Sequence, residues 1–222
     1  MTDLPPKTLK TYASIAGISL LIMTVAAIFA VGWLSKAETE IPNDTVSWSL
    51  RGSIGAWLLI LITDVLVAWA LYVLLRPVDR FWSLLSGWLR MLYAGILGMA
   101  IVFLLLAKQS GLESTETALT HIGTFRDVWS FGLILFGFHL LILGPLCVKS
   151  EYVPKWIGYL ITLAGVGYVI IHLGNTLVPD FSGIRKILEM IFMLPMIVGE
   201  VGLAIWLLVR RNRLPELVLV GQ

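Results

Sequence analysis

The sequence has few charged residues and almost no cysteine. Asp, Glu, Lys and Arg make up 14% of its 222 residues, well below the roughly 25% of an average soluble domain. The single cysteine, Cys147, excludes a disulfide within the chain and any metal motif built on cysteine pairs. The net charge is only +2, and no basic stripe is interleaved with aromatic residues, so we expect no nucleic-acid partner.

Apolar residues are abundant instead, at 58% of the chain. A helix that crosses a bilayer needs about 20 consecutive apolar residues, and runs of about that length are predicted at 13–34, 54–75, 83–107, 130–148, 157–178 and 187–209. The first run is too long for the apolar part of a signal peptide, so we expect it to be retained. The sequence therefore predicts an all-α fold, a polytopic bundle of six transmembrane helices in a single membrane domain, residues 1–222, with the lipid bilayer as its surroundings.

The distribution of Lys and Arg predicts the orientation. The segments on the N-terminal side hold Lys7, Lys10, Arg76, Arg80, Lys149, Lys155, Arg210, Arg211 and Arg213, and those on the other side hold Lys36, Arg51, Lys108, Arg126, Arg185 and Lys186. The positive-inside rule places the richer side in the cytoplasm. Both termini are therefore expected to be cytoplasmic, in the cell's inner or plasma membrane.

The connections at 35–53 and 108–129 are long and acidic, so we expect their acidic side chains to be solvated and leave room there for short surface helices. Tryptophans at predicted span ends, Trp129 among them, are typical of anchors at the headgroup zone. Small residues recur at helical spacing, as in Ala13/Gly17 and Gly158/Thr162/Gly165. Such spacing allows close packing between helices in lipid.

Ionisable side chains inside the predicted spans indicate where a functional site would lie, because they are costly in hydrocarbon. These residues are Asp64, Arg90, His139, His172 and Glu200. The helical rise per residue places four of them, all except His172, in one polar layer roughly 10–16 Å from the N-terminal side. By the same rise His172 lies roughly 22 Å from that side, near Asn175, and predicts a second polar cluster.

The four residues of the layer can be grouped into two pairs. Asp64 and Arg90 lie on consecutive helices joined by a short turn, which predicts a salt bridge. The bridge is either a structural clamp between the two helices or one wall of a ligand or proton site. His139 and Glu200 are expected to pair likewise across the fourth and sixth helices, and an imidazole beside a carboxylate suits proton transfer near neutral pH. A purely structural polar contact is the alternative.

Two cofactors, haem and zinc, can be weighed from the positions of the candidate ligands. Two histidines bind one haem only at similar depth, and His139 and His172 differ by roughly 9 Å on the helical rise. Zinc held by Asp64, His139 and Glu200 agrees with their shared depth and with the ligands of zinc hydrolases. However, a neighbouring arginine opposes a cation, and no spaced ligand motif such as HExxH is present. We therefore assign no metal ligands, expect no haem, and keep zinc as an alternative.

The second half of the chain carries a motif shared with a known family. It consists of FGFHLL at 136–141, Gly144 and KSEYVPKWIG at 149–158, with Leu194-Pro195, Gly199-Glu200 and LAIWLL at 203–208 in the last helix. With Asp64 and Arg90, these segments resemble a bacterial integral membrane family catalogued as domain of unknown function 4386, over roughly residues 10–210. Pro145 departs from the tyrosine commoner in that family and puts the local helix geometry in question. The resemblance implies six membrane helices and no particular substrate, reaction or cofactor.

No complete catalytic motif is present, which favours a protein that is not an enzyme. The leading hypothesis is small-molecule or proton handling through Asp64, Arg90, His139 and Glu200. One alternative is an accessory or scaffold subunit bound to another membrane protein or to a second copy of the chain. That alternative predicts a polar layer that is dry, fully paired and without a pocket. The other alternative is an intramembrane metal-dependent hydrolase.

Overall fold

The fold is known from a computed structural model that describes residues 9–40, 48–111 and 114–213. These residues form α1 (Leu9–Glu40), α2 (Trp48–Leu75), α3 (Arg80–Ser110), α4 (Thr115–Lys149), α5 (Lys155–Leu177), α6 (Ser182–Arg210) and the short 3-10 helix η1 (Arg211–Arg213). All six α-helices are long and apolar enough to cross a membrane. The predicted all-α class and six-helix architecture are thereby confirmed for the described part of the chain, which is a multi-pass membrane protein.

The fourth helix is longer than the sequence suggested. It begins at Thr115, where the Ser114 hydroxyl accepts a hydrogen bond from the Thr117 amide at 3.3 Å. Residues 115–129, expected in a connection, are therefore its first four turns, and the predicted helix start at 130 was wrong, although Glu116 and Asp127 are exposed as expected. The physical reason is an apolar stripe within this polar segment, because Ala118, Ile122 and Phe125 are all fully buried.

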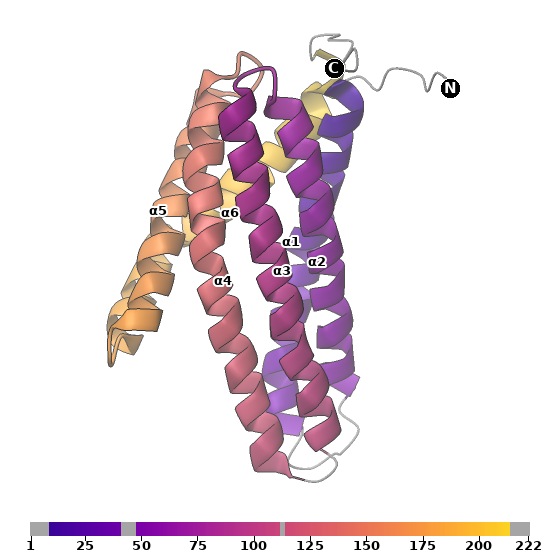
Figure 1. Cartoon of the computed structure of the whole chain (residues 1–222), viewed down its shortest axis with the longest axis vertical. Helices are drawn as coiled ribbons and strands as arrows, with labels where there is room; N and C mark the ends of the chain where they lie inside the picture. Colours follow the sequence, from indigo (N-terminus) through magenta and orange to yellow (C-terminus); the bar gives the residue numbers. More distant parts are fainter. Residues whose placement is uncertain (1–8, 41–47, 112–113, 214–222) are drawn as a thin grey trace, which may run out of the picture.

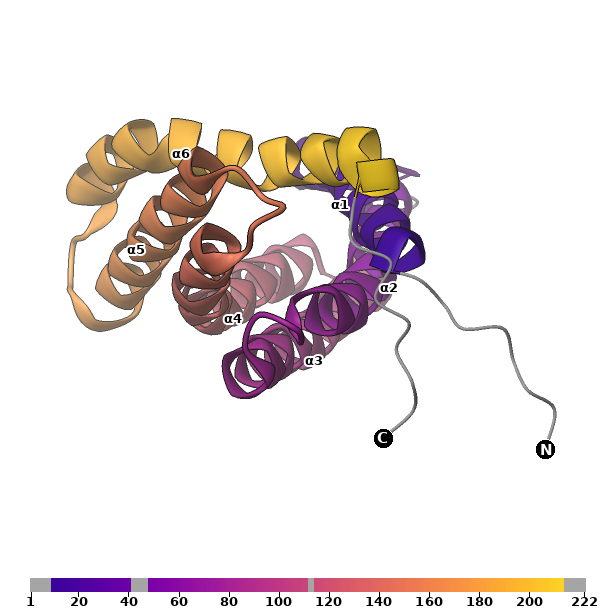
Figure 2. The same cartoon turned by 90° about the horizontal axis from the view of Figure 1, so that it is seen from above.

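The six helices form a closed ring. Each helix packs against the next one in the chain, and α6 returns to pack against α1 (Figure 2). The return contact is tight, since a Cβ on Gly17 would lie 2.7 Å from Leu208 Cγ and 2.9 Å from the Ala204 carbonyl oxygen. The beginning of α1 and η1 therefore lie at the same end of the bundle, called here the terminal end (Figure 1). The opposite end is called the distal end.

Glycines bring α4 and α5 into backbone contact. A Cβ on Gly158 would lie 2.7 Å from the Gly144 carbonyl oxygen, and one on Gly165 would lie 2.9 Å from the Gly137 carbonyl oxygen. The small residues predicted as a packing seam on α5 thus face two glycines of α4. Close backbone approach of this kind stabilises helix pairs in lipid through van der Waals packing.

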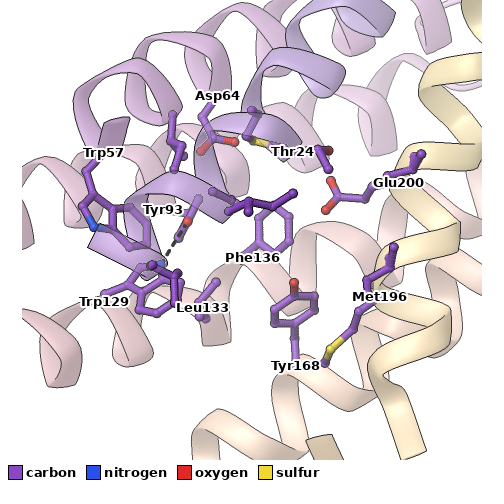
Figure 3. Close-up of a pocket in the computed structure, with 18 residues that line it drawn as sticks. Thr24, Trp57, Asp64, Tyr93, Trp129, Leu133, Phe136, Tyr168, Met196 and Glu200 are labelled. Atoms are coloured by element: carbon purple, nitrogen blue, oxygen red, sulfur yellow. Dashed lines mark hydrogen bonds between the residues drawn. The ribbon is translucent and has the colours of Figure 1, made fainter. Parts of the chain in front are cut away.

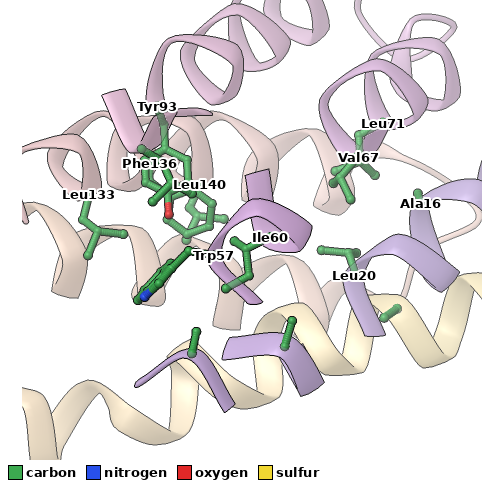
Figure 4. Close-up of a cluster of buried hydrophobic side chains, with 14 of the residues drawn as sticks. Ala16, Leu20, Trp57, Ile60, Val67, Leu71, Tyr93, Leu133, Phe136 and Leu140 are labelled. Carbon is green, nitrogen blue, oxygen red and sulfur yellow. The ribbon is translucent and has the colours of Figure 1, made fainter. Parts of the chain in front are cut away.

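The interior of the ring is apolar over most of its length. Side chains of α1 and α2, such as Leu20, Ile60 and Val67, are buried along one side, and Phe136 and Leu140 of α4 face them from the other (Figure 4). Many large apolar side chains also face outward, such as Ile28, Met99 and Val209, as a lipid environment requires. Polar groups inside the ring are therefore confined to a few places, and these define the candidate site.

Candidate functional site

Arg90 is the central residue of the candidate site. It projects from α3 into the ring and is 0% exposed. Its guanidinium group contacts side chains from four other helices: Met23 of α1, Asp64 of α2, Phe136 and His139 of α4, and Glu200 of α6. Arg90, Asp64, His139, Glu200 and Ser86 are called the Arg90 cluster below. The structure thus brings together all four residues predicted to share one polar layer.

Asp64 is the closest partner of Arg90. Its Oδ1 atom accepts from Arg90 Nε at 2.9 Å and lies 2.7 Å from Nη2, which confirms the predicted salt bridge. The turn between α2 and α3 sets this geometry, and Asp79 begins α3 by accepting from the amides of Phe81 and Trp82 at 3.1 Å. Asp64 Oδ2 is buried and has no hydrogen-bond partner within the protein. One oxygen of this carboxylate is thus left for another group.

His139 and Glu200 meet through Arg90 and not directly. Arg90 Nη1 lies 3.2 Å from His139 Nε2 and 3.3 Å from Glu200 Oε1. The sequence suggested that the two residues pair with each other across α4 and α6. That pairing is absent because the guanidinium group, with its fork of five N–H donors, lies between them.

The contacts of His139 determine its protonation state. An arginine N–H can only donate, so His139 Nε2 must accept and carries no proton. The proton is therefore on Nδ1, which donates to the Ser86 carbonyl oxygen at 2.9 Å and lies 2.9 Å from the Ser86 hydroxyl. The imidazole is neutral, and its one lone pair is used by Arg90. In this arrangement His139 is a positioning residue rather than a free base or metal ligand.

The same arrangement bears on the zinc alternative. Within the described residues, no group of three His, Cys, Asp or Glu side chains is close enough to hold a metal ion. Asp64, His139 and Glu200 converge on the guanidinium group of Arg90, which occupies the position that a metal would need. A cation cannot share that position with a group of the same charge.

A pocket adjoins the Arg90 cluster and extends from it toward the distal end. Its volume is about 650 Å³, within the range of small-molecule sites. Every one of the six helices contributes to its walls (Figure 3). Asp64 and Glu200 line it next to the cluster, and Trp57 and Trp129 line it farther along.

The walls between these two ends are aromatic. Phe136 packs against Tyr93 with ring centroids 5.0 Å apart and against Tyr168 at 5.2 Å. Trp129 donates to the Tyr93 hydroxyl at 3.3 Å. Trp129 was expected to be a membrane-interface anchor, and it lies inside the bundle because α4 begins earlier than predicted. The pocket is thus an aromatic chamber with two carboxylates at one end.

The sequence analysis did not identify these aromatic residues. A usable signal was present: Tyr93 and Phe136 each lie three residues from a buried polar residue, Arg90 and His139, and so share its helix face. Tyr168 stands in the same relation, four residues before His172. An aromatic residue one turn from an intramembrane charge therefore indicates a site wall.

Comparison with family models matches residues 15–210 to the family described as Domain of unknown function (DUF4386). The chain belongs to this family. An uncharacterized protein of the archaeon Archaeoglobus fulgidus is 37% identical to this chain over 160 residues, which cover 72% of this chain and 84% of the relative. No solved structure matches the chain significantly. The resemblance seen in the sequence is confirmed, and the bacterial origin it implied stays a prediction.

This DUF4386 chain has a second polar cluster nearer the distal end, as His172 and Asn175 predicted. The two do not bond directly, and Ser130 of α4 links them, lying 2.8 Å from His172 Nδ1 and accepting from Asn175 Nδ2 at 3.1 Å. Arg185 donates to Asn175 Oδ1 at 3.3 Å. These four residues are called the His172 cluster. Its one carboxylate contact is the ion pair of Arg185 with Glu189, both of whose side chains are partly exposed, and none of its four members lines the pocket.

Proposed function

We propose that this chain is a small-molecule-binding membrane protein, a carrier or a binding protein, whose site is the pocket beside the Arg90 cluster. One observation carries the proposal: the carboxylates of Asp64 and Glu200 line a chamber of about 650 Å³ that is otherwise largely apolar. Apolar pockets with a few convergent polar groups are the usual form of small-molecule sites. Intramembrane ionisable residues are rare outside such sites.

The scaffold alternative agrees less well with the geometry. A purely structural polar layer would be fully paired and without a pocket, whereas Asp64 Oδ2 is buried without a partner and Asp64 lines the chamber. An unpaired buried acceptor costs about 1–3 kcal/mol. That cost is expected where a ligand or water completes the hydrogen bonding, and it is unexpected in a clamp.

The metal-dependent hydrolase is also less well supported. Arg90 uses the lone pair of His139, and its positive charge lies between the two carboxylates. A zinc ion would have to displace the arginine from a fully buried position, which would leave that charge without partners. We therefore propose binding without metal chemistry.

The proposal can be tested by native mass spectrometry of the protein released from nanodiscs. The wild type is expected to retain a small molecule that is lost in Ala27→Phe, because Ala27 lines the pocket and the larger ring would fill it. Ile18→Phe is the matched control, since Ile18 is on the same helix, is 49% exposed and does not line the pocket. Elemental analysis of the same samples measures bound metal.

Three results would count against this function. A wild type with no bound small molecule, or a molecule retained equally in Ala27→Phe, would remove the pocket as the site. A second polypeptide held at fixed stoichiometry would favour the accessory-subunit alternative. Stoichiometric zinc that is lost in His139→Ala would favour the hydrolase.

We further propose that the terminal end of the bundle faces the cytoplasm of a cell membrane. The turns and helix ends on that side hold Arg76, Lys149 and Lys155, which supports this orientation. Cys147 is buried, so single added cysteines report exposure cleanly. In intact cells an impermeant maleimide is expected to label Gln109→Cys at the distal end and not Glu151→Cys. The reverse labelling pattern would invert the topology.

A further inference from the structure

The charges and walls of the pocket indicate which class of molecule it binds. We infer that the pocket takes a lipophilic organic cation, with its positive group at the Asp64–Glu200 end and its apolar substituents against the aromatic walls. This inference rests on the proposed function and adds the chemical class of the ligand. Three independent features support it: unpaired carboxylate oxygens, aromatic faces and a mouth that opens to lipid.

The carboxylates have more capacity to accept than the protein satisfies. Asp64 contacts Arg90 only through Oδ1, and its buried Oδ2 has no partner. Glu200 contacts Arg90 only through Oε1, at the longer distance of 3.3 Å. Among the residues that the structure describes, Arg90 is the one cation in contact with both carboxylates, so the cluster carries an excess negative charge when both are ionised. A ligand with a positive charge would balance that excess within a medium where an unbalanced charge is costly.

The walls suit the rest of such a molecule. The faces of tryptophan, tyrosine and phenylalanine rings attract cations through their quadrupoles, and the Arg90 guanidinium already lies 5.1 Å from the Phe136 ring centroid. Tyr168, Tyr93 and Phe136 surround the chamber beside the carboxylates (Figure 3). An anion would meet both the carboxylates and the negative ring faces, and the pocket therefore discriminates by sign of charge.

The mouth of the pocket indicates that the ligand is lipophilic. Ile28 of α1 and Ile197 of α6 line the pocket and are 69% and 55% exposed, so the chamber opens sideways between these helices. Toward the terminal end the same two helices are in close contact at Gly17, which leaves no opening between them there. A molecule that enters between α1 and α6 must pass through the hydrocarbon of the bilayer, which selects for apolar substituents around its charge.

The test uses two ions of the same shape and opposite charge, tetraphenylphosphonium and tetraphenylborate. Binding of each labelled ion is measured with the full-length protein in nanodiscs of zwitterionic phosphatidylcholine, with empty nanodiscs subtracted. We expect saturable binding of the cation with one site per chain, and no saturable binding of the anion. Glu200→Gln is expected to weaken cation binding about tenfold or more, because a charged hydrogen-bond partner is lost.

Two further variants make the result interpretable. Glu189→Gln removes the same group from the same helix, but Glu189 pairs with the exposed Arg185 outside the pocket, so cation affinity should be unchanged. Ala27→Phe should abolish cation binding while both carboxylates stay in place. This variant tests the inference even if Glu200→Gln does not yield a monodisperse protein. Cation affinity that is the same in Glu200→Gln and wild type, or insensitive to Ala27→Phe, would overturn the inference.

The two proposals fail in different ways. Equal or tighter binding of tetraphenylborate would overturn the ligand class and leave the pocket as a binding site. The ligand class would also be overturned if the cation did not bind and a neutral or anionic molecule co-purified with the wild type but not with Ala27→Phe. If neither ion binds and the wild type carries no small molecule, the proposed function falls together with the inference.

Discussion

The Arg90 cluster and the His172 cluster use the same pairing in two different settings. In each, the Nδ1 atom of a histidine lies within 2.9 Å of a serine hydroxyl on a neighbouring helix. His139 then meets a fully buried guanidinium flanked by two carboxylates, whereas His172 shares its serine with an amide. The comparison teaches that a serine–histidine contact joins helices in either setting. The buried charges beside it are what make one of the two a candidate site.

Removing the buried charge should have the largest effect and should separate the clusters most clearly. Arg90→Met leaves Asp64 and Glu200 without a counter-charge, so we expect a loss of about 3–5 kcal/mol of stability or failure to obtain a monodisperse protein. Thermal unfolding in detergent measures it. Arg126→Met is the control, because its ion pair with Glu38 is largely exposed and such pairs contribute at most about 1 kcal/mol. Similar losses in the two variants would contradict the central role of Arg90.

Loosening the contact between α4 and α5, which lies between the two clusters, should have the second largest effect on stability. A Cβ on Gly137 would lie 2.9 Å from the Val169 amide nitrogen, so Gly137→Ala must push α4 from α5 beside both His139 and Tyr168. We expect a loss of about 1–3 kcal/mol together with weaker ligand binding. Gly123→Ala, on the same helix with nothing within 4 Å of its Cβ, should be neutral or stabilising by up to about 1 kcal/mol. Melting temperatures of the two variants test this, and Gly137→Ala should melt at the lower temperature.

Ser130→Ala should have a moderate effect confined to the His172 cluster. The hydroxyl joins His172 to Asn175, and hydrogen bonds between membrane helices contribute about 0.6 to 1.7 kcal/mol. Pocket binding should not change, because neither Ser130 nor His172 lines the pocket. Loss of ligand affinity in Ser130→Ala, with the melting temperature nearly unaltered, would show that the two clusters act as one.

Ser86→Ala should have the smallest effect, although it lies in the more important cluster. His139 Nδ1 keeps its bond to the Ser86 backbone carbonyl, which the substitution does not remove. We expect a stability loss below that of Ser130→Ala, about 0.5 kcal/mol. Melting temperatures of the two variants measured side by side decide the order. A larger loss in Ser86→Ala would mean that the hydroxyl, and not the carbonyl, orients His139.

Much of the fold could be predicted because hydrocarbon imposes simple rules. Apolar runs long enough to span a bilayer gave six helices, and consecutive helices must pack as neighbours, which was sufficient for the Asp64–Arg90 bridge. Residues 115–129 were missed because the stripe of Ala118, Ile122 and Phe125 is interrupted by polar residues on the exposed face. The closure of α6 on α1 depends on a contact between the two ends of the chain, which no local pattern reveals.

The candidate site could be predicted in its composition but not in its connectivity. Depth alone placed Asp64, Arg90, His139 and Glu200 in one layer. It could not show that Arg90 lies between His139 and Glu200, because a rise per residue does not give the direction in which a side chain points. The pocket walls were missed for a similar reason. Trp129 is next to the predicted span and was assigned to the headgroup zone, which is where most tryptophans near span ends lie.

The short connection between α2 and α3 also has a consequence for how the protein enters the membrane. Asp64 and Arg90 are 26 residues apart in sequence, whereas Arg90 and Glu200 are separated by 110. Two opposite charges on adjacent helices can neutralise each other as soon as that hairpin leaves the ribosome. The α2–α3 hairpin can therefore partition into lipid with the two charges inside its helices already balanced. The ring is completed only when α6, which follows the other five helices along the chain, brings the second carboxylate to an arginine that is already in place.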